Sequence, residues 1–201
     1  MSWIKTIEYA EADPRLKRLY DRVKGPQNNV DNVLLIHSLR PHTLVGHMTL
    51  YKNVLHNSNN TLPKWYLEAI GVYVSFLNKC DYCYKHHFAG FSRLYGDQNG
   101  VAKYRQAVEN DKLDTFFDEK YFMGSMYARD ITLNHFDVKK EHISDLRNVG
   151  FSDGEILEIN QVASYFNYVN RMVVTLGVDT RGDIIGLSPN DSDDPNNWNH
   201  E

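Results

Sequence analysis

The stretch from Glu68 to His87 reads EAIGVYVSFLNKCDYCYKHH and contains two helical patterns with a short break between them. In its first half, apolar residues recur three and four positions apart, which predicts a helix that begins near Lys64. Glu68 lies within this helical stretch, on a stripe next to the apolar one. A second helix is expected to begin near Cys80 and to end before Gly96. These two adjacent helices hold the most reactive residue types of the chain.

The rest of the sequence has the same helical periodicity, with Gly and Pro between segments and little sustained alternation, so an all-α fold is predicted. Residues 1–188 are expected to form a single domain, and residues 189–201 a flexible tail that buries no apolar surface. Further helices are expected from Pro14 to about Val23, over Val30–Leu39, from Pro41 to about Leu55, over Asp111–Asn134, over Val138–Asn148, and from the Ser152–Glu155 capping box to about Leu176.

Length, composition and charge limit the class of protein. The 201 residues include 42% hydrophobic and 24% charged residues, with a formal net charge of −4. These values are typical of a folded globular chain, and they offer no basic surface to a nucleic acid. The first twenty residues carry charges throughout, unlike a signal peptide, and every apolar run is too short to cross a membrane. We therefore expect a cytoplasmic protein with neither nucleic acid nor membrane as partner.

Cys80 and Cys83 are the only cysteines, and in a reducing compartment such a pair favours redox or metal chemistry over a structural disulfide. If a helix begins at Cys80, then Cys80, Cys83 and His87 stand at positions i, i+3 and i+7 on one stripe. Cysteines three residues apart in a helical turn have Cα atoms within the roughly 4.4 to 6.8 Å that a disulfide requires. A reversible disulfide would therefore need little backbone movement.

A helix N-terminus favours a thiolate, and a histidine one turn further on can accept its proton. Such a thiolate can attack a peroxide oxygen to give a sulfenic acid, which the second cysteine condenses to a disulfide that an external dithiol reduces. Glu68 is a candidate to orient His87 or to relay a proton through water. The alternative for Glu68 is a solvated surface carboxylate.

The pattern E-x11-C-x-x-C-x3-H, within V-S-x-L-N-x-C-x-Y-C-x-x-H-H, resembles the AhpD-like branch of the carboxymuconolactone decarboxylase superfamily, in particular its peroxidase-related members. Two later segments, residues 146–157 (LRNVGFSDGEIL) and 166–178, also look like the second half of that family. The resemblance covers about residues 28–179. A C-x-x-C motif alone is weak evidence, but the Glu, the His and the later segments in register make the match specific.

The resemblance implies an all-helical, homo-oligomeric thiol peroxidase or thiol-disulfide enzyme that uses neither haem nor flavin nor metal. Its substrates would be a hydroperoxide and an external dithiol or dithiol protein. In this family the second cysteine is attacked by peroxide, which implies that Cys83 is attacked and Cys80 resolves, with Glu68 and His87 in the proton relay. The helix dipole leaves this choice open, because Cys80 lies nearer the helix N-terminus.

Three further residues are predicted to support the site. Ser75 and Asn78 resemble family positions and could hydrogen-bond near the cysteines, or could instead cap the two helices. Tyr82 stands where the best-studied branch has a histidine, which predicts a shorter and slower proton relay. His86 points about 100° away from His87 on a helix and is interpreted as a surface or interface residue. Asn170 is expected to have a structural role, and the remaining histidines are interpreted as ordinary.

Two other functions are compatible with these residues. Cys80, Cys83 and His87, with Glu68 or His86, could instead hold a structural zinc ion, although their spacing differs from that of usual zinc sites. His87 and Glu68 alone could perform a decarboxylase-like or isomerase-like proton transfer, as in relatives that lack the cysteines. The aromatic cluster Tyr165, Phe166 and Tyr168 suits burial between subunits or in a rich core.

Overall fold

The computed structural model describes residues 1–187, 194 and 197–198, and every regular element in this part of the chain is a helix. The prediction of an all-α fold is confirmed. The α-helices are α1 (Pro14–Tyr20), α2 (Asn32–Leu35), α3 (Pro41–His56), α4 (Lys64–Leu77), α5 (Asp81–Tyr95), α6 (Gln98–Glu109), α7 (Glu119–Leu133), α8 (Lys140–Asn148) and α9 (Asp153–Thr175).

Helix starts follow the local signals in the sequence. Asp13 accepts a hydrogen bond from the backbone N–H of Leu16, and proline follows it at the first helical position of α1. At α9, the Ser152 side chain accepts from the N–H of Glu155, whose carboxylate accepts from the N–H of Ser152. This reciprocal capping box fixes where the longest helix begins.

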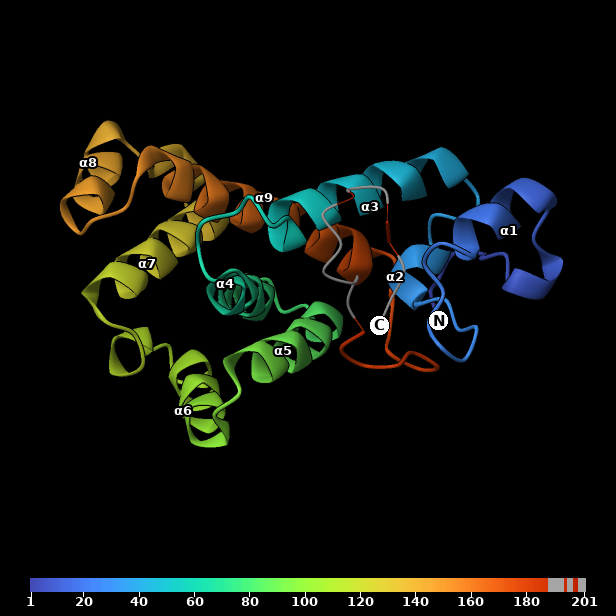
Figure 1. Cartoon of the computed structure of the whole chain (residues 1–201), viewed down its shortest axis with the longest axis horizontal. Helices are drawn as coiled ribbons and strands as arrows, with labels where there is room; N and C mark the ends of the chain where they lie inside the picture. The colour runs from blue at the N-terminus through green and yellow to red at the C-terminus, as the bar shows by residue number, and fades with distance from the viewer. Residues whose placement is uncertain (188–193, 195–196, 199–201) are drawn as a thin grey trace.

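Helix α4 lies at the centre of the molecule and is seen end-on in Figure 1, with α3 and α9 above it, α5 below it and α7 to one side. Its residues from Tyr66 to Ser75 are all buried. A helix surrounded in this way is apolar on most of its faces, which explains why Glu68 within it lies in the core. A Cβ at Gly71 would lie 2.3 Å from the Phe166 ring, so glycine is needed for this close approach of α4 and α9.

A second, smaller apolar cluster joins α1, α2 and α3, and it includes Trp198. Trp198 is only 1% exposed, and the Arg22 guanidinium lies 3.6 Å from the centre of its ring. The expectation that residues 189–201 bury no apolar surface is therefore wrong at Trp198, where an aromatic ring finds both an apolar cluster and a cation. Most of that predicted tail lies outside the described residues.

Three helix predictions need correction. Helix α6 was not expected, although Asp97 accepts hydrogen bonds from the N–H groups of Asn99 and Gly100 at its start. The helix expected over Asp111–Asn134 begins only at Glu119, because Asp118 caps it there. The helix expected over Val30–Leu39 is a single turn, Asn32–Leu35.

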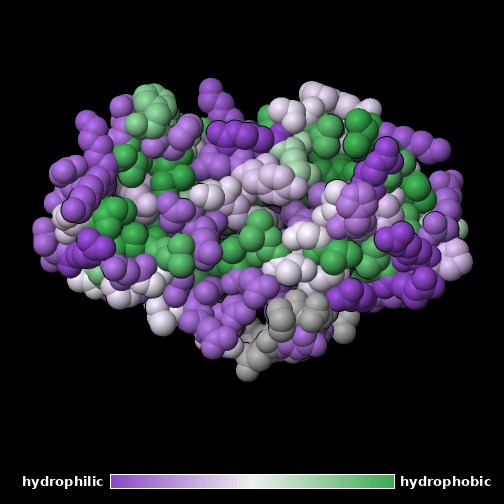
Figure 2. Space-filling view, turned by 90° about the horizontal axis from the view of Figure 1, so that it is seen from above, coloured by the Kyte–Doolittle hydropathy of each residue, from purple (hydrophilic) through white to green (hydrophobic). Residues whose placement is uncertain are grey.

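The surface carries both polar and apolar groups, and Figure 2 shows hydrophobic patches over both ends of the molecule. Tyr165 and Phe166 are buried within the chain, whereas Tyr168 is exposed, so the burial of the first two requires no second subunit. A homo-oligomer stays a prediction. Among the described residues, no helix is long and apolar enough to cross a membrane.

Candidate active site

The tight connection between α4 and α5 positions both cysteines. Lys79 adopts a left-handed φ of 55° after α4, and the N–H of Cys80 then donates a hydrogen bond to the carbonyl of Ser75. Cys80 takes the N-cap position of α5, and Cys83 lies in the first turn of that helix. The prediction that a helix begins at the first cysteine is confirmed.

Both thiols are free and buried. The thiol of Cys83 donates a hydrogen bond to the sulfur of Cys80, and this bond lowers the pKa of Cys80 below its usual value despite burial. The same hydrogen bond raises the pKa of Cys83 well above its usual value, and burial raises it further. In the reduced pair, Cys80 is therefore the more readily ionised cysteine, and Cys83 holds its proton more strongly.

Glu68 and His87 form a hydrogen-bonded dyad, with 2.8 Å between Oε2 of Glu68 and Nδ1 of His87. Glu68 is only 2% exposed, so its alternative interpretation as a surface carboxylate is wrong. An ionised Glu68 requires the proton of His87 to be on Nδ1, which leaves Nε2 as the basic nitrogen. The dyad thus holds the imidazole in the tautomer that a general base needs.

His56, at the end of α3, approaches the same carboxylate from the other side. Its Nε2 atom lies 3.8 Å from Oε1 of Glu68. Burial lowers the pKa of His56 to about 4, even though Glu68 acts in the opposite direction, so this imidazole is neutral at physiological pH. From the sequence, His56 was interpreted only as an ordinary residue. Its sequence position carried no signal, because only the packing of α3 on α4 brings it to Glu68.

A network of side-chain amides lies on the other side of the cysteines. The Asn170 amide in α9 donates to Oγ of Ser75 (3.1 Å), and the Asn78 amide donates to Oδ1 of Asn170 (3.0 Å). Hydrogen bonding by Asn170 also lowers the pKa of Cys80 and of Cys83. Ser75 and Asn78 thus reach the cysteines through Asn170, which the sequence indicated only as a structural residue.

Tyr82 and His86 stack on one another, with ring centres 4.6 Å apart, on a face of α5 that is different from that of Cys83. The hydroxyl of Tyr82 donates to Asp183 Oδ2 at 2.5 Å and accepts from the N–H of Val33 at 3.2 Å. Tyr82 therefore ties α5 to α2 and to the segment after α9. The His86 side chain is 10% exposed, so the prediction of a surface residue is wrong within this chain.

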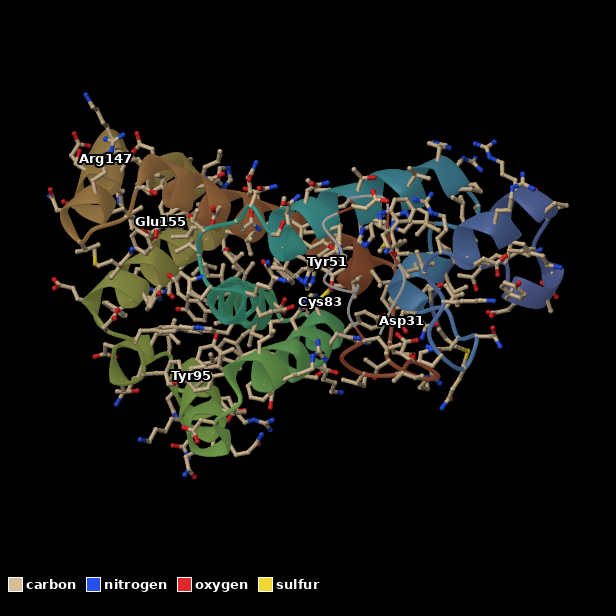
Figure 3. The ribbon with its side chains drawn as sticks, viewed as in Figure 1. Asp31, Tyr51, Cys83, Tyr95, Arg147 and Glu155 are labelled. Carbon is tan, nitrogen blue, oxygen red and sulfur yellow. The ribbon has the colours of Figure 1, made fainter. Side chains whose placement is uncertain are left out.

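The Cys83 thiol and the dyad line one cavity between α2, α3, α5 and α9. In Figure 3, Cys83 lies below Tyr51 of α3 and to the left of Asp31, which precedes α2. Met48, Tyr51, Tyr165 and Val169 supply its apolar and aromatic walls. Cys80 does not line this cavity; it lines two more open recesses with Lys79 and Asp81. The two cysteines therefore contact different spaces.

The comparison with solved structures identifies the architecture. An AhpD-core, uncharacterized peroxidase-related protein from Ralstonia eutropha JMP134 superposes with a TM-score of 0.77 at 21% identity, covering 89% of this chain and 92% of that one. The chain has the AhpD-like fold. An uncharacterized peroxidase-related protein from Silicibacter sp. TM1040 gives a TM-score of 0.74 at 22% identity, covering 90% and 95% of the two chains.

The same AhpD-like fold occurs in the debrominase Bmp8, solved as a cysteine-to-alanine variant in complex with 2,3,4-tribromopyrrole. That chain has a TM-score of 0.69 and 17% identity, with 89% of this chain and 91% of that one covered. No family model matches the sequence. No curated protein matches it either.

The described residues include no group of three or more His, Cys, Asp or Glu side chains arranged to hold a metal ion. The zinc site considered from the sequence would need Cys80, Cys83 and His87 together with Glu68 or His86. In the AhpD-like fold observed here, the two cysteines contact different spaces and Glu68 is hydrogen-bonded to His87. The zinc interpretation therefore has no ligand set in this part of the chain.

Proposed function

We propose that this chain is a thiol-dependent peroxidase of the AhpD-like family that reduces a hydroperoxide and is restored by a dithiol. The observation that carries the proposal is that Cys83 and the His87–Glu68 dyad line one buried cavity. A nucleophile, a base and a group that orients the base are the parts that nucleophilic catalysis requires. The AhpD-like fold supports this proposal, because solved structures with that fold include peroxidase-related proteins.

In the first step, Nε2 of His87 removes the proton from the Cys83 thiol, and the resulting thiolate attacks the terminal oxygen of the hydroperoxide ROOH. The O–O bond breaks, Cys83 becomes a sulfenic acid, and the leaving alkoxide takes the proton from His87 to give the alcohol ROH. Glu68 stabilises the imidazolium that forms between these two proton transfers. The high pKa of Cys83 makes this base necessary.

In the second step, the Cys80 thiolate attacks the Cys83 sulfur. Hydroxide leaves and takes up a proton, which gives water and the Cys80–Cys83 disulfide. The Cys83 hydrogen bond that lowers the pKa of Cys80 in the reduced pair no longer exists once Cys83 is oxidised, so Cys80 gives up its own thiol proton to form this thiolate, and the leaving hydroxide takes up that proton. An external dithiol then reduces the disulfide by thiol–disulfide exchange, becoming a disulfide itself. The sum is ROOH plus a dithiol giving ROH, water and a disulfide.

Thiol counting before and after one equivalent of cumene hydroperoxide tests the proposal. We expect two free thiols before oxidation and none after it, with a mass lower by two hydrogens, and recovery of both thiols on addition of a dithiol. The Cys80→Ser variant should trap a sulfenic acid on Cys83, whereas Cys83→Ser should not react at the same peroxide concentration. Trapping on Cys80 alone would reverse the roles, and unchanged thiols in the wild type would refute the peroxidase.

A second candidate reaction is reductive dehalogenation of an aromatic ring, because Tyr51 and Tyr165 line the cavity with aromatic surface. In that reaction the two thiols supply two electrons, a proton replaces the halogen on the ring, and halide leaves as the disulfide forms. A solved protein with the same fold is a debrominase in complex with 2,3,4-tribromopyrrole, which supports testing this reaction. Bromide release from a bromopyrrole, measured beside peroxide consumption, distinguishes the two reactions.

Proton transfer through His87 and Glu68 alone, the other alternative from the sequence, would not need the cysteines. A Cys80→Ser, Cys83→Ser double variant separates this reaction from the proposed one. Loss of hydroperoxide turnover in that variant is expected for a thiol peroxidase. Full retention of a decarboxylase or isomerase activity would instead favour the proton-transfer function.

A further inference from the structure

The cavity that holds Cys83 has a second group of polar residues, which the proposed reaction does not use. Asp31, Tyr82 and His86 line the cavity, and Asp183 lies behind them. Some of these side chains are fully hydrogen-bonded within the chain, and others have hydrogen-bonding capacity that a ligand could use.

Asp183 serves the fold. Its carboxylate accepts hydrogen bonds from the Tyr82 hydroxyl (2.5 Å) and from the backbone N–H of Asn32 (3.1 and 3.2 Å to its two oxygens). These bonds hold the segment after α9 against α2 and α5. Since Asn32 is the first residue of α2, Asp183 also supplies the anion at the start of that helix.

Asp31 does not serve the fold in this way. It occupies the N-cap position of α2, where an aspartate usually accepts a backbone hydrogen bond, yet its side chain makes no capping bond. Among the described residues, its carboxylate accepts one hydrogen bond, a long one of 3.4 Å from the Asn29 amide to Oδ1. Asp31 is only 8% exposed, and it lines the cavity that contains Cys83. A buried carboxylate with so few donors is costly to the fold.

The neighbours of Asp31 do not neutralise it. Burial and the charge of Asp183 raise the pKa of Asp31 to about 6, so it is largely ionised at neutral pH. Nε2 of His86 lies 3.5 Å from Asp183 Oδ2 and is buried without a hydrogen-bond partner. Two buried polar groups with unused hydrogen-bonding capacity therefore line the cavity that Cys83 also lines.

We propose that Asp31 anchors the substrate by accepting a hydrogen bond from an N–H or O–H group on a small aromatic molecule, with His86 beside it. The aromatic body would lie against Tyr51 and Tyr165, and the reacting atom would meet Cys83. This inference rests on the proposed function for the identity of the reacting atom. It narrows the substrate class from hydroperoxides in general to aromatic hydroperoxides that carry a hydrogen-bond donor.

Binding of two probes of similar shape tests this proposal without any thiol chemistry. Indole has a ring N–H, and benzofuran has an oxygen in its place. We expect the reduced protein, titrated by ligand-observed NMR without peroxide, to bind indole about tenfold or more tightly than benzofuran, because a hydrogen bond to a charged group is worth that much. Asp31→Leu should abolish the preference, Asp31→Asn should reduce it, and the exposed-site control Asp21→Asn should keep it.

Thermal unfolding distinguishes an anchoring role from a structural one. If Asp31 is reserved for a ligand, Asp31→Asn should have a Tm equal to or above that of the wild type, since it removes a poorly paired buried charge. A lower Tm together with an unchanged preference for indole would overturn the proposal, and so would failure of both probes to bind. If the protein binds indole more tightly than benzofuran but consumes no hydroperoxide, the proposed function is refuted, whereas the role of Asp31 as a substrate anchor is supported.

Discussion

Gly90 of α5 faces the carboxylate of Glu68 on α4 so closely that a Cβ at position 90 would lie 3.1 Å from Cδ and Oε1 of Glu68. The missing side chain gives the buried carboxylate room to reach His87. The geometry of the dyad therefore depends on a residue that makes no hydrogen bond to it.

Gly90→Ala should displace the Glu68 carboxylate by a few tenths of an ångström and weaken its bond to His87. We expect disulfide formation by hydroperoxide to slow by severalfold to about tenfold, the range for partial loss of one charge-assisted hydrogen bond. The matched control is Gly46→Ala in α3, where a Cβ meets nothing within 4 Å. That variant should oxidise normally and gain about 0.4 to 1 kcal/mol of stability. Equal oxidation rates in the two variants would contradict the prediction.

Removing one cysteine should change the pKa of the other, and the two changes should have opposite signs. Cys83→Ala removes the hydrogen bond that stabilises the Cys80 thiolate, so the pKa of Cys80 should rise. Cys80→Ala removes the group that holds the proton on Cys83, so the pKa of Cys83 should fall towards its usual value. The pH dependence of alkylation, followed by peptide mass spectrometry, measures both changes. Shifts of the same sign in both variants would show that the thiols are not coupled.

Asn170→Ala should affect both stability and thiol chemistry. The variant leaves Ser75 and Asn78 without their buried partner, which should cost about 2 to 3 kcal/mol in urea unfolding. It should also raise the pKa of Cys80, which a purely structural role would leave unchanged. Asn110→Ala, at the exposed end of α6, should change the unfolding free energy by less than about 0.5 kcal/mol. An unaltered alkylation profile in Asn170→Ala would limit this residue to the fold.

Stability should fall with acidity between about pH 6.5 and pH 4, and His37 should contribute to the loss. Burial lowers the pKa of His37 to about 4, below its value of about 6.5 in an unfolded chain. In that window the unfolded state binds a proton that the folded state does not, so stability is complete above it and decreases as the pH falls through it. His37→Gln should remove about 2 kcal/mol of the difference between pH 7.5 and pH 5. The exposed control His42→Gln should behave as the wild type in urea titrations at both pH values.

The site residues that the sequence predicted are close to one another in the chain. Cys83 and His87 lie one turn apart on α5, Cys80 is the N-cap of that helix, and Glu68 lies in the preceding helix, so short-range periodicity places all four in or next to adjacent helices. The capping box at Ser152 is local in the same sense. Such features require only the geometry of one helix or one tight connection.

The residues that the sequence missed come from distant segments. The packing of α3 and α9 brings His56 and Asn170 to the site. Asp31 and Asp183 are 152 positions apart in the chain, yet they lie close enough for the charge of Asp183 to raise the pKa of Asp31. No periodicity within one helix reports such contacts. Helix α6 was missed for a different reason: its polar composition hid the spacing of its buried residues, even though the Asp97 cap was visible.

Cys83 contacts the enclosed cavity and Cys80 contacts the outer recesses, so a bond between their sulfurs would join two environments that the first turn of α5 keeps apart. In the proposed reaction, a large protein donor could therefore supply electrons on the Cys80 side to an oxidant in the cavity that it does not touch. The walls around Cys83 could change to admit a new oxidant while the donor is retained, and the surface around Cys80 could change donors while the oxidant is retained. Selection could thus act on the two specificities of this chain independently, through residues that lie on opposite sides of one helical turn.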